Sequence, residues 1–523
     1  MKKLFYILIL FTLNAQAQLH KMLADTDFFY TYGGTNFDET RDIKETLDKN
    51  YIMVGTTSSF GQGDASVYMI KTDALGKHIW SSVQGGAVND WAYAVEITPD
   101  SGFFVAGYSN SFNASGHNYF SPYYFKTDKN GVLVWQKSID VGSWSFIYSS
   151  CALPDSGFIL CGQTYYATPN GSSDAYLMRI NKNGDTLWTN HYGGIQDETF
   201  NSVCVINSKI YAAGSNATHP TDTVADGWVV KLDLQGHKLQ EAFLSYGYHQ
   251  QEVINGISIY NDTMFSVCGN QIHIDTNVTT GIAARYDTSL IVIQDITHLS
   301  SLYTLYNNPA VTLYSKVVTI SDGSTCIIGS KVGAGLGGYG MFCVGFSSLG
   351  YNIDGFYPTI GGHLDDYGYS VIYTSQGRVI AVGSTQSTAD YCANPTLGLE
   401  DVFLVRYNSD SIHTQGVVPI YSCYLDTLFL WQTNIKNYTK EGTITLFPNP
   451  VCGNATLNIQ GNYSNNLIVK VYSLLGEAVL TLNVNSNEKN NINFSFLSEG
   501  SYFLKVQDVY GNNISVIKFM VAY

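Results

Sequence analysis

Short runs of alternating apolar and polar residues recur along most of the chain, without the three- and four-residue spacing of an amphipathic helix. Residues 93–98, 103–108, 123–127 and 132–137 form one set of four such runs, separated by turn-forming sequences such as Pro-Asp-Ser-Gly. The pattern therefore predicts an all-β protein of short strands joined by tight turns.

The strand pattern repeats, and a glycine ends the second strand of every copy. The copies lie 52–60 residues apart, as in the steps from 55 to 107 and from 269 to 329. The marker glycines are Gly55, Gly107, Gly162, Gly214, Gly269, Gly329 and Gly383. Seven four-stranded units at this period predict a seven-bladed β-propeller, with a solenoid or a row of sandwiches as the alternative.

The two ends of the repeat region are incomplete in a complementary way. The seventh copy ends after its third strand at residues 401–408, while residues 28–34 are similar to the fourth strand and Gly-Gly pair at 79–86. An N-terminal strand that completes the last blade would close the ring and leave no open sheet edge. We therefore expect a propeller at residues 27–416 and a linker at 417–443.

Residues 1–17 have the pattern of a secretory signal peptide. Lys2 and Lys3 precede a run of about ten apolar residues, which ends near the small-x-small cleavage site at 15–17. A buried N-terminal helix is the alternative. No later stretch reaches 18 apolar residues, so we expect an exported chain that starts at Gln18 and has no stable membrane span.

Composition narrows the possible functions. Charged residues make up 13% of the chain, aromatic residues 14%, and the formal net charge is −15, which does not suit binding to nucleic acid. Neither CxxC nor HExxH spacing occurs, so no metal or cofactor is expected. Cys161 and Cys268 fit small core positions, whereas the disulfide state of Cys392, Cys423 and Cys452 stays open.

Loop length differs between the two rims of the expected ring. Loops between second and third strands and the blade connections vary, and we call their rim the variable rim; the opposite, short-turn rim carries tight turns. Insertions on one face mark a binding face, and its aromatic residues suit stacking on sugars or contact with a protein. With Phe60, which also looks exposed, the candidates are Tyr119, Phe120, Tyr165, Tyr166 and Tyr391. The alternative is that these rings pack the loops onto the blades.

Acidic residues follow several Gly-Gly pairs, at Asp38, Asp90, Asp197 and Asp366. Catalytic carboxylates would occur once, in an asymmetric setting, so these recurring residues are expected to cap turns. No catalytic residue is assigned. The turn at 128–135 resembles the Asp-box hairpin of sialidases with a different spacing, and also resembles quinoprotein dehydrogenase blades, without a quinone or metal signature.

The composition changes from Ile444 onward. A Phe-Pro-Asn-Pro segment, a Leu-Gly turn, a Gly-Ser-Tyr turn and a final strand resemble the type A C-terminal sorting domain of the type IX secretion system. The matching residues are Phe447, Pro448, Asn449, Pro450, Gly476, Gly500, Tyr502 and Lys518. The resemblance implies a small Ig-like β-sandwich at 444–523, passage through the periplasm, recognition by the outer-membrane translocon, and removal of the domain. An ordinary Ig-like binding domain is the alternative.

The repeats are similar to the large propeller-repeat proteins exported by Bacteroidetes-type bacteria. We therefore expect a secreted or outer-membrane-surface protein that binds an unknown glycan or protein and is not an enzyme. The alternative is a polysaccharide-active enzyme, a glycoside hydrolase or lyase, with its site at the channel mouth. Two carboxylates about 5–10 Å apart there would favour the enzyme. A quinone-type oxidoreductase is a third, weaker possibility, and the oligomeric state is not predicted.

Overall fold

In a computed structural model, the chain forms two compact units that divide between Phe429 and Leu430. The structure describes residues 28–112, 119–139, 144–165, 173–217, 224–247, 249–276, 278–295, 311–320, 322–332, 338–346, 348, 359–360, 364–386, 399–407, 420–425, 442–447, 451, 453–461, 466–473, 478–486, 489–498, 500–508 and 513–521. Within these ranges all regular elements are strands, and no helix is long and apolar enough to span a bilayer. The chain is therefore all-β, as the alternating pattern predicts.

Six sheets of the first unit consist of four consecutive antiparallel strands, which we number sheets 1 to 6. Sheets 1 to 3 comprise β2 (Asp38–Glu45), β3 (Tyr51–Thr57), β4 (Ser66–Thr72) and β5 (His78–Gln84); β6 (Asp90–Ile97), β7 (Phe103–Ser109), β8 (Ser121–Thr127) and β9 (Leu133–Ser138); and β10 (Ser145–Ala152), β11 (Phe158–Tyr165), β12 (Ser173–Ile180) and β13 (Thr186–Tyr192). Sheets 4 to 6 comprise β14 (Glu198–Ile206), β15 (Lys209–Asn216), β16 (Asp226–Leu232) and β17 (Lys238–Leu244); β18 (Gln250–Asn261), β19 (Met264–His273), β20 (Val278–Asp287) and β21 (Val292–Asp295); and β22 (Thr312–Thr319), β23 (Thr325–Val332), β24 (Tyr339–Phe346) and β25 (Thr359–Ile360).

Sheet 7 joins the two ends of the first unit. It has the order β26 (Asp366–Tyr373), β27 (Val379–Thr385), β28 (Asp401–Tyr407), β1 (Phe28–Gly33) and β29 (Ile420–Leu425). The N-terminal strand β1 is antiparallel to β28, with Tyr30 opposite Leu404. Its other edge pairs in parallel with β29, inside the range expected to be a linker. That expectation was incomplete, because a strand there supplies hydrogen-bond partners to an edge that β1 would otherwise leave open.

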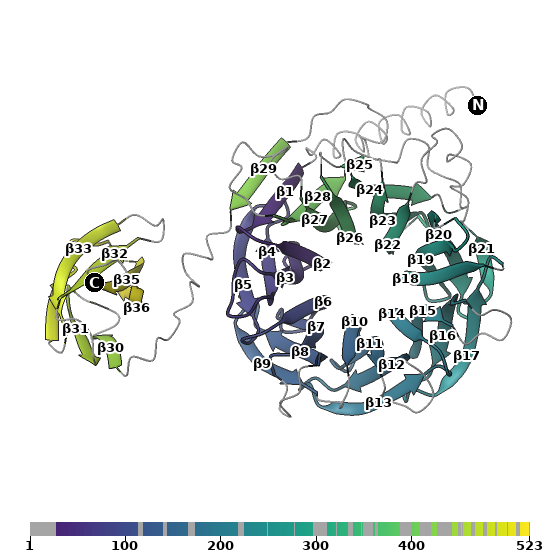
Figure 1. Cartoon of the computed structure of the whole chain (residues 1–523), viewed down its shortest axis with the longest axis horizontal. Coiled ribbons are helices and arrows are strands. Elements are labelled where there is room, and N and C mark those ends of the chain that lie inside the picture. The colour runs from purple at the N-terminus through teal and green to yellow at the C-terminus, as the bar shows by residue number, and fades with distance from the viewer. Residues whose placement is uncertain are drawn as a thin grey trace, which may run out of the picture. The chain divides into compact units, whose positions relative to one another are not determined.

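The seven sheets follow one another around a ring, with the first strand of each sheet innermost (Figure 1). Each inner strand contacts the next sheet, and β2 contacts β26 and β27, so the contacts run around the whole ring. Apolar residues of the second and third strands fill the spaces between sheets, as Ile52 and Val67 of sheet 1 do against Val95 of sheet 2. The ring is therefore held by face-to-face packing of neighbouring sheets.

Each inner strand carries a β-bulge that leaves one residue without a partner on the second strand. The marker glycine lies beside this bulge. A Cβ atom on Gly107 would lie closer to the backbone oxygen of Trp91 than real Cβ atoms approach, and the other six marker glycines face an equivalent carbonyl. The bulged residues, which we call the bulge ring, are Arg41, Tyr93, Tyr148, Asn201, Asn255, Ser315 and Tyr369.

The C-terminal unit contains two small antiparallel sheets around its own core. One has the order β30 (Gly442–Phe447), β31 (Asn454–Gly461) and β34 (Lys489–Asn493). The other has the order β33 (Ala478–Asn485), β32 (Asn466–Tyr472), β35 (Gly500–Asp508) and β36 (Asn513–Val521). Leu457, Val469, Leu504 and Phe519 belong to the shared apolar core, which explains the strict alternation of these strands.

Candidate functional site

The bulge ring brings together side chains that lie about 50 residues apart in sequence. Its members are half-buried, whereas the residues before and after the bulge in β6, Ala92 and Ala94, are buried. Contacts link neighbouring members: the rings of Tyr93 and Tyr148 lie 5.7 Å apart, and Asn201 lies 3.5 Å from the side-chain oxygen of Asn255. These contacts place the ring of bulged residues on the inner side of the sheets.

Arg41 occupies a fixed position within the bulge ring. Its guanidinium Cζ lies 4.2 Å from the ring centroid of Tyr369 and 5.3 Å from that of Tyr93. Its Nε and Nη2 groups donate to the two carboxylate oxygens of Glu39 at 3.0 and 2.7 Å. The cation is therefore stacked, bidentately paired and held in one orientation. Burial raises the pKa of Glu39, while Arg41 opposes this shift.

Toward the short-turn rim, a second group of charges begins directly after the bulges. Lys316 of β22 lies 3.2 Å from Asp42 of β2, although sheet 7 separates their sheets in the ring. Asp42 also accepts hydrogen bonds from the Ser370 hydroxyl and the Val95 N–H, at 2.8 and 3.2 Å. Burial alone would raise the pKa of Asp42, but Lys316, Lys44 and these hydrogen bonds hold it below its ordinary value.

A neighbouring ion pair joins the first two sheets at the same depth. Lys44 of β2 lies 3.0 Å from Glu96 of β6, and both side chains are partly exposed. Burial raises the pKa of Glu96, and the nearby Asp42 adds to this shift while Lys44 opposes it. The two carboxyl groups thus lie in one cluster and have pKa values displaced in opposite directions.

Sequence reasoning missed the bulge ring because its residues look like ordinary strand positions. One signal was present: the alternation shifts by one residue where two consecutive positions are buried, as at Ala94 and Val95. Tyr93 therefore points to the same side as Glu96, three residues later, and only a bulge permits this in a strand.

The structure describes three of the five predicted ligand-binding aromatic residues. Phe120 lies 5.9 Å from the ring of Phe146 and also contacts Tyr108 and Trp144, while Tyr165 lies 6.0 Å from Phe146. Tyr119 is partly exposed, and Tyr166 and Tyr391 lie outside the described residues. Phe120 and Tyr165 therefore extend an aromatic cluster that reaches the inner strand β10.

One exposed-looking aromatic residue was wrongly interpreted. Phe60 is only 5% exposed, and its ring lies 5.6 Å from that of Tyr68 in the core of sheet 1. The polar residues around it in the sequence hide this packing, because the loop folds back onto its own sheet.

The repeated carboxylates cap turns, as expected. Asp38 accepts the Gly34 N–H at 2.7 Å and the Ser59 hydroxyl at 2.6 Å, and Asp90 accepts the Gly86 N–H at 2.7 Å. In sheet 4 this role belongs to Glu198, which accepts the Gly194 N–H at 3.0 Å. Asp197 was therefore placed one residue off.

Asp197 instead accepts a hydrogen bond from the Ser173 hydroxyl at 2.7 Å. Burial raises the pKa of both Asp38 and Asp90, against the hydrogen bonds that they accept. The carboxylates of Asp38 and Asp90 already accept hydrogen bonds within the fold, so they are poorly placed to act on a ligand.

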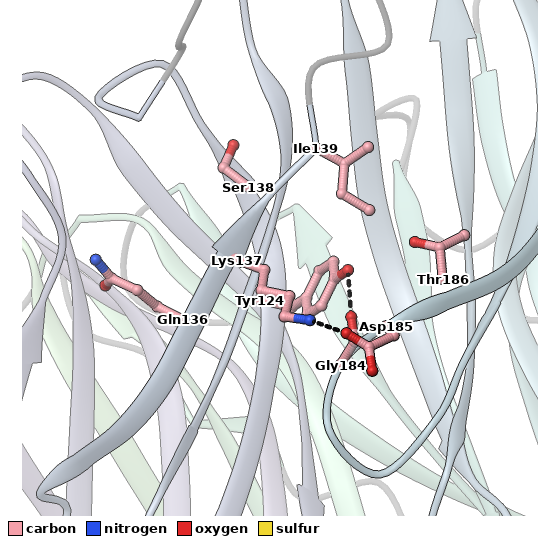
Figure 2. Close-up of a pocket in the computed structure, with 8 residues that line it drawn as sticks. All are labelled: Tyr124, Gln136, Lys137, Ser138, Ile139, Gly184, Asp185 and Thr186. Atoms are coloured by element: carbon pink, nitrogen blue, oxygen red, sulfur yellow. Dashed lines mark hydrogen bonds and ion pairs between the residues drawn. The ribbon is translucent and has the colours of Figure 1, made fainter.

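A pocket of about 480 Å³ lies between sheets 2 and 3 (Figure 2), and no residue of the bulge ring lines it. Two pairs of its polar groups are already bonded to each other: the Tyr124 hydroxyl donates to the Gly184 carbonyl at 3.0 Å, and Lys137 lies 2.5 Å from Asp185. Among the described residues, no group of three His, Cys, Asp or Glu side chains could hold a metal ion. The bulge ring and its flanking residues are thus the stronger candidate site.

The predicted sorting residues lie in the C-terminal unit. Phe447 is the last residue of β30, Gly500 opens β35, and Lys518 lies in β36. Tyr502 is buried, and its hydroxyl donates to the Ser498 carbonyl at 3.0 Å. Pro448, Asn449, Pro450 and Gly476 lie outside the described residues.

Comparison with known proteins gives one family match, which lies in the C-terminal unit, and several structural neighbours. Residues 445–522 match the family described as the Secretion system C-terminal sorting domain. The Neurospora crassa Pan2 WD40 domain is similar in structure, at 9% identity, over 74% of this chain and 92% of that chain, with a TM-score of 0.43. The propeller domain of the Trilobed protease from Pyrococcus furiosus is 10% identical over 75% and 99%, with a TM-score of 0.40.

A Penicillium chrysogenum α-L-arabinanase complexed with arabinobiose is 12% identical over 60% of this chain and 92% of that chain, with a TM-score of 0.38. At these identities and TM-scores, the neighbours support no statement about the activity of this chain. No curated protein sequence matches the chain.

The ring of four-stranded sheets makes the chain an all-β protein of the propeller type, and it carries a secretion module. More specifically, its C-terminal unit is a type IX secretion sorting domain, which implies that the protein is exported to the cell surface or secreted.

Proposed function

We propose that the propeller is a non-catalytic binding module, which meets its ligand at the variable-rim end of the bulge ring. The asymmetry of that ring carries the proposal. Sheets 7, 1, 2 and 3 contribute Tyr369, Arg41, Tyr93 and Tyr148, whereas sheets 4 to 6 contribute two asparagines and a serine. Repetition of the fold explains the capping carboxylates, but it does not explain aromatic rings on only one side.

The loop aromatic residues belong to the same proposed surface. Phe120 and Tyr165 contact Phe146, which is the neighbour of Tyr148 two positions along β10. A ligand at the bulge ring would therefore reach the variable rim along one continuous aromatic wall. Tyr119, with Tyr166 and Tyr391, completes the proposed set of loop contacts.

Binding by the full chain to oligosaccharide and peptide arrays tests this proposal. Tyr93→Ala and Tyr148→Ala are expected to weaken binding by about 5- to 150-fold, as for aromatic residues at the centre of an interface. Tyr260→Ala is the matched control, because Tyr260 also stacks on an arginine, Arg285, but lies at the end of β18 nearest the short turn. A loss that follows Tyr260 and spares Tyr93 would contradict the proposed face.

A polysaccharide-active enzyme is a second candidate, favoured by one observation. Asp42 and Glu96 lie in one charge cluster, with a lowered and a raised pKa respectively, as a base and an acid require. Against this, each carboxylate is already paired with a lysine. Release of reducing ends from a polysaccharide, abolished by Glu96→Gln, would replace the binding proposal by this one.

The export route is proposed to begin with the signal peptide at residues 1–17. The sorting domain would then engage the outer-membrane translocon and be removed, which leaves the propeller released or attached at the surface. Detection of a mature N-terminus at Gln18 on the exported protein tests the first step. An exported protein that retains Lys2 and Lys3 would contradict it.

A further inference from the structure

The bulge ring has two chemically different halves. In one half, Tyr369 and Tyr93 flank Arg41, and Tyr148 continues the row of rings. In the other half, the Asn201 amide group donates to the Ile254 carbonyl at 3.0 Å. The Asn255 amide group donates to the Tyr314 carbonyl at 2.8 Å. An aromatic wall thus faces a wall of anchored amides.

The hydrogen bonds that hold the two asparagine amides leave their side-chain oxygens available as acceptors. The NH₂ groups of Asn201 and Asn255 are engaged with backbone carbonyls of the next sheet. The Asn201 oxygen accepts only a 3.2 Å hydrogen bond from Thr199, and that of Asn255 a 3.5 Å contact, within the described residues. Both oxygens retain lone pairs for a ligand that presents hydroxyl groups.

The charge balance at this level does not favour an anion. Arg41 is the cation of the bulge ring, and Glu39 neutralises it through both carboxylate oxygens. Two further carboxylates lie nearby: Asp365 accepts the Tyr367 hydroxyl at 3.3 Å, and the charge of Glu400 acts on Glu39. The Arg41 charge is thus already compensated, which leaves it little attraction for a ligand carboxylate or sulfate.

The aromatic wall does not favour a cation either. The Arg41 guanidinium lies 4.2 Å from the ring centroid of Tyr369 and 5.3 Å from that of Tyr93, so this wall already carries a positive charge. A second cation there would be repelled by the first. The arrangement is best matched by an uncharged ligand with an apolar face for the rings and hydroxyl groups for the amides.

We propose that the bulge ring binds a neutral saccharide, with a sugar ring stacked on the Tyr93–Tyr148 wall and hydroxyl groups bonded to Asn201 and Asn255. This inference rests on the proposed binding function and specifies its ligand class. Sugar rings have one face of C–H groups, which packs on an aromatic ring, and equatorial hydroxyls, which suit planar amides. Arg41, held by Glu39, positions the flanking tyrosines and offers its remaining N–H groups to ring oxygens.

The Lys316–Asp42 and Lys44–Glu96 ion pairs lie at the short-turn end of the proposed site. The Lys316–Asp42 pair joins β22 and β2, which lie on either side of sheet 7, and Asp42 follows Arg41 toward the short turn. A saccharide that enters from the variable rim would reach the bulge ring before this pair.

An array of neutral and acidic oligosaccharides, probed with the purified full chain, tests the ligand class. Calorimetry then compares the best neutral oligosaccharide with an acidic one of equal length, at low and high salt. We expect binding to neutral saccharides, with affinity changed less than about twofold between 50 and 500 mM NaCl. Tyr93→Ala and Asn201→Ala are each expected to weaken it by about 5- to 100-fold.

Two variants separate a binding role from a structural one. Tyr369→Phe keeps an aromatic ring over Arg41 and should retain binding, whereas Tyr369→Leu removes the ring and should abolish binding. The melting temperatures of both variants show whether either change has destabilised the fold. Tyr260→Ala is the control that should leave binding unchanged.

The outcomes also separate this inference from the proposed function. Binding of acidic saccharides in preference to neutral ones, or of a peptide alone in a Tyr93-dependent way, overturns the ligand class and leaves the binding function intact. If a peptide binds and no saccharide does, the ligand class is likewise wrong and the binding function stands. Absence of any binding, or loss only with Tyr260→Ala, overturns both.

Discussion

At residue scale, seven glycines and seven bulges determine what the ring presents on its inner side. The carbonyl beside each bulge occupies the space that a Cβ atom of the marker glycine would need, at Gly107 as at the other six positions. The glycine permits the bulge, and the bulge turns a side chain such as Tyr93 inward. The glycines therefore recur in every sheet because the bulge requires them, whereas the bulged residues differ in type from sheet to sheet.

Substitution of one marker glycine should destabilise the ring strongly. Gly107→Ala places a methyl group against the backbone oxygen of Trp91, so we expect a loss of about 2–4 kcal/mol in the free energy of unfolding. Gly247→Ala is the control: nothing lies within 4 Å of its Cβ, and only its φ of 126° is unfavourable, which costs about 1 kcal/mol. Equal melting temperatures for the two variants would contradict this account.

The capping carboxylate Asp38 should make stability depend on pH. Burial raises its pKa from 3.8 to about 6, against hydrogen bonds from Ser59, Thr57 and Gly34 that lower it. Between these values the folded state binds the proton more tightly than the unfolded state, so this group stabilises the fold at pH 4 and progressively less toward pH 6.

Asp38→Asn removes this titration. Relative to the wild type, the variant should gain about 1–3 kcal/mol in the free energy of unfolding as the pH rises from 4 to 6. Denaturant melts at several pH values measure this difference. Asp64→Asn, at an exposed position, is the control that should show no such trend, and a flat difference for Asp38→Asn as well would sink the argument.

At element scale, the aspartate-glycine-tryptophan turns explain why neighbouring sheets keep the same spacing. Asp128 accepts the backbone N–H groups of Asn130 and Val132, and the ring of Trp80 from the preceding sheet lies over Gly131. The turn was predictable from its residues, and so were the strands. The bulges were not, because alternation identifies a strand without saying where it gains a residue.

Loop aromatic residues were the less predictable part of the candidate site. Phe60 and Phe120 occur in similar polar surroundings, yet Phe60 is buried on Tyr68 while Phe120 joins the cluster around Phe146. Which ring a loop residue contacts depends on how its loop folds, onto its own sheet for Phe60 and toward the next sheet for Phe120, and local sequence does not contain that information.

The N-terminal strand should be necessary for a closed ring. β1 lies between β28 and β29, and Tyr32 is fully buried, with its hydroxyl donating to the Gly76 carbonyl. Deletion of residues 18–34 removes this strand, so we expect aggregation and a lower melting temperature because the edge of β28 is exposed. Deletion of residues 18–26 keeps β1 and serves as the control. Unchanged light scattering and melting in the longer deletion would refute this role.

At the scale of the whole molecule, ring closure is what creates the candidate site. Asp42 is bonded from β6, β22 and β26, so four strands that are distant in sequence depend on one carboxylate. A period of repeats predicts the sheets but not which side chains meet at the inner side, because that depends on residues more than 300 positions apart, such as Asp42 and Ser370. The sorting domain, in contrast, was recognisable from short local segments.

The two units should separate in folding and in export. Each has its own apolar core, and the division falls after β29, so a chain that ends at Phe429 keeps every strand of sheets 1 to 7. Without residues 430–523 the propeller should melt within about 2 °C of its transition in the full chain. If the sorting domain is what the translocon recognises, as proposed, the same truncated chain should accumulate in the periplasm of its host. Protease accessibility on intact cells measures this, with the full chain as the control. Cleavage of the truncated chain at the surface, at the level of the full chain, would show that export does not need the C-terminal unit.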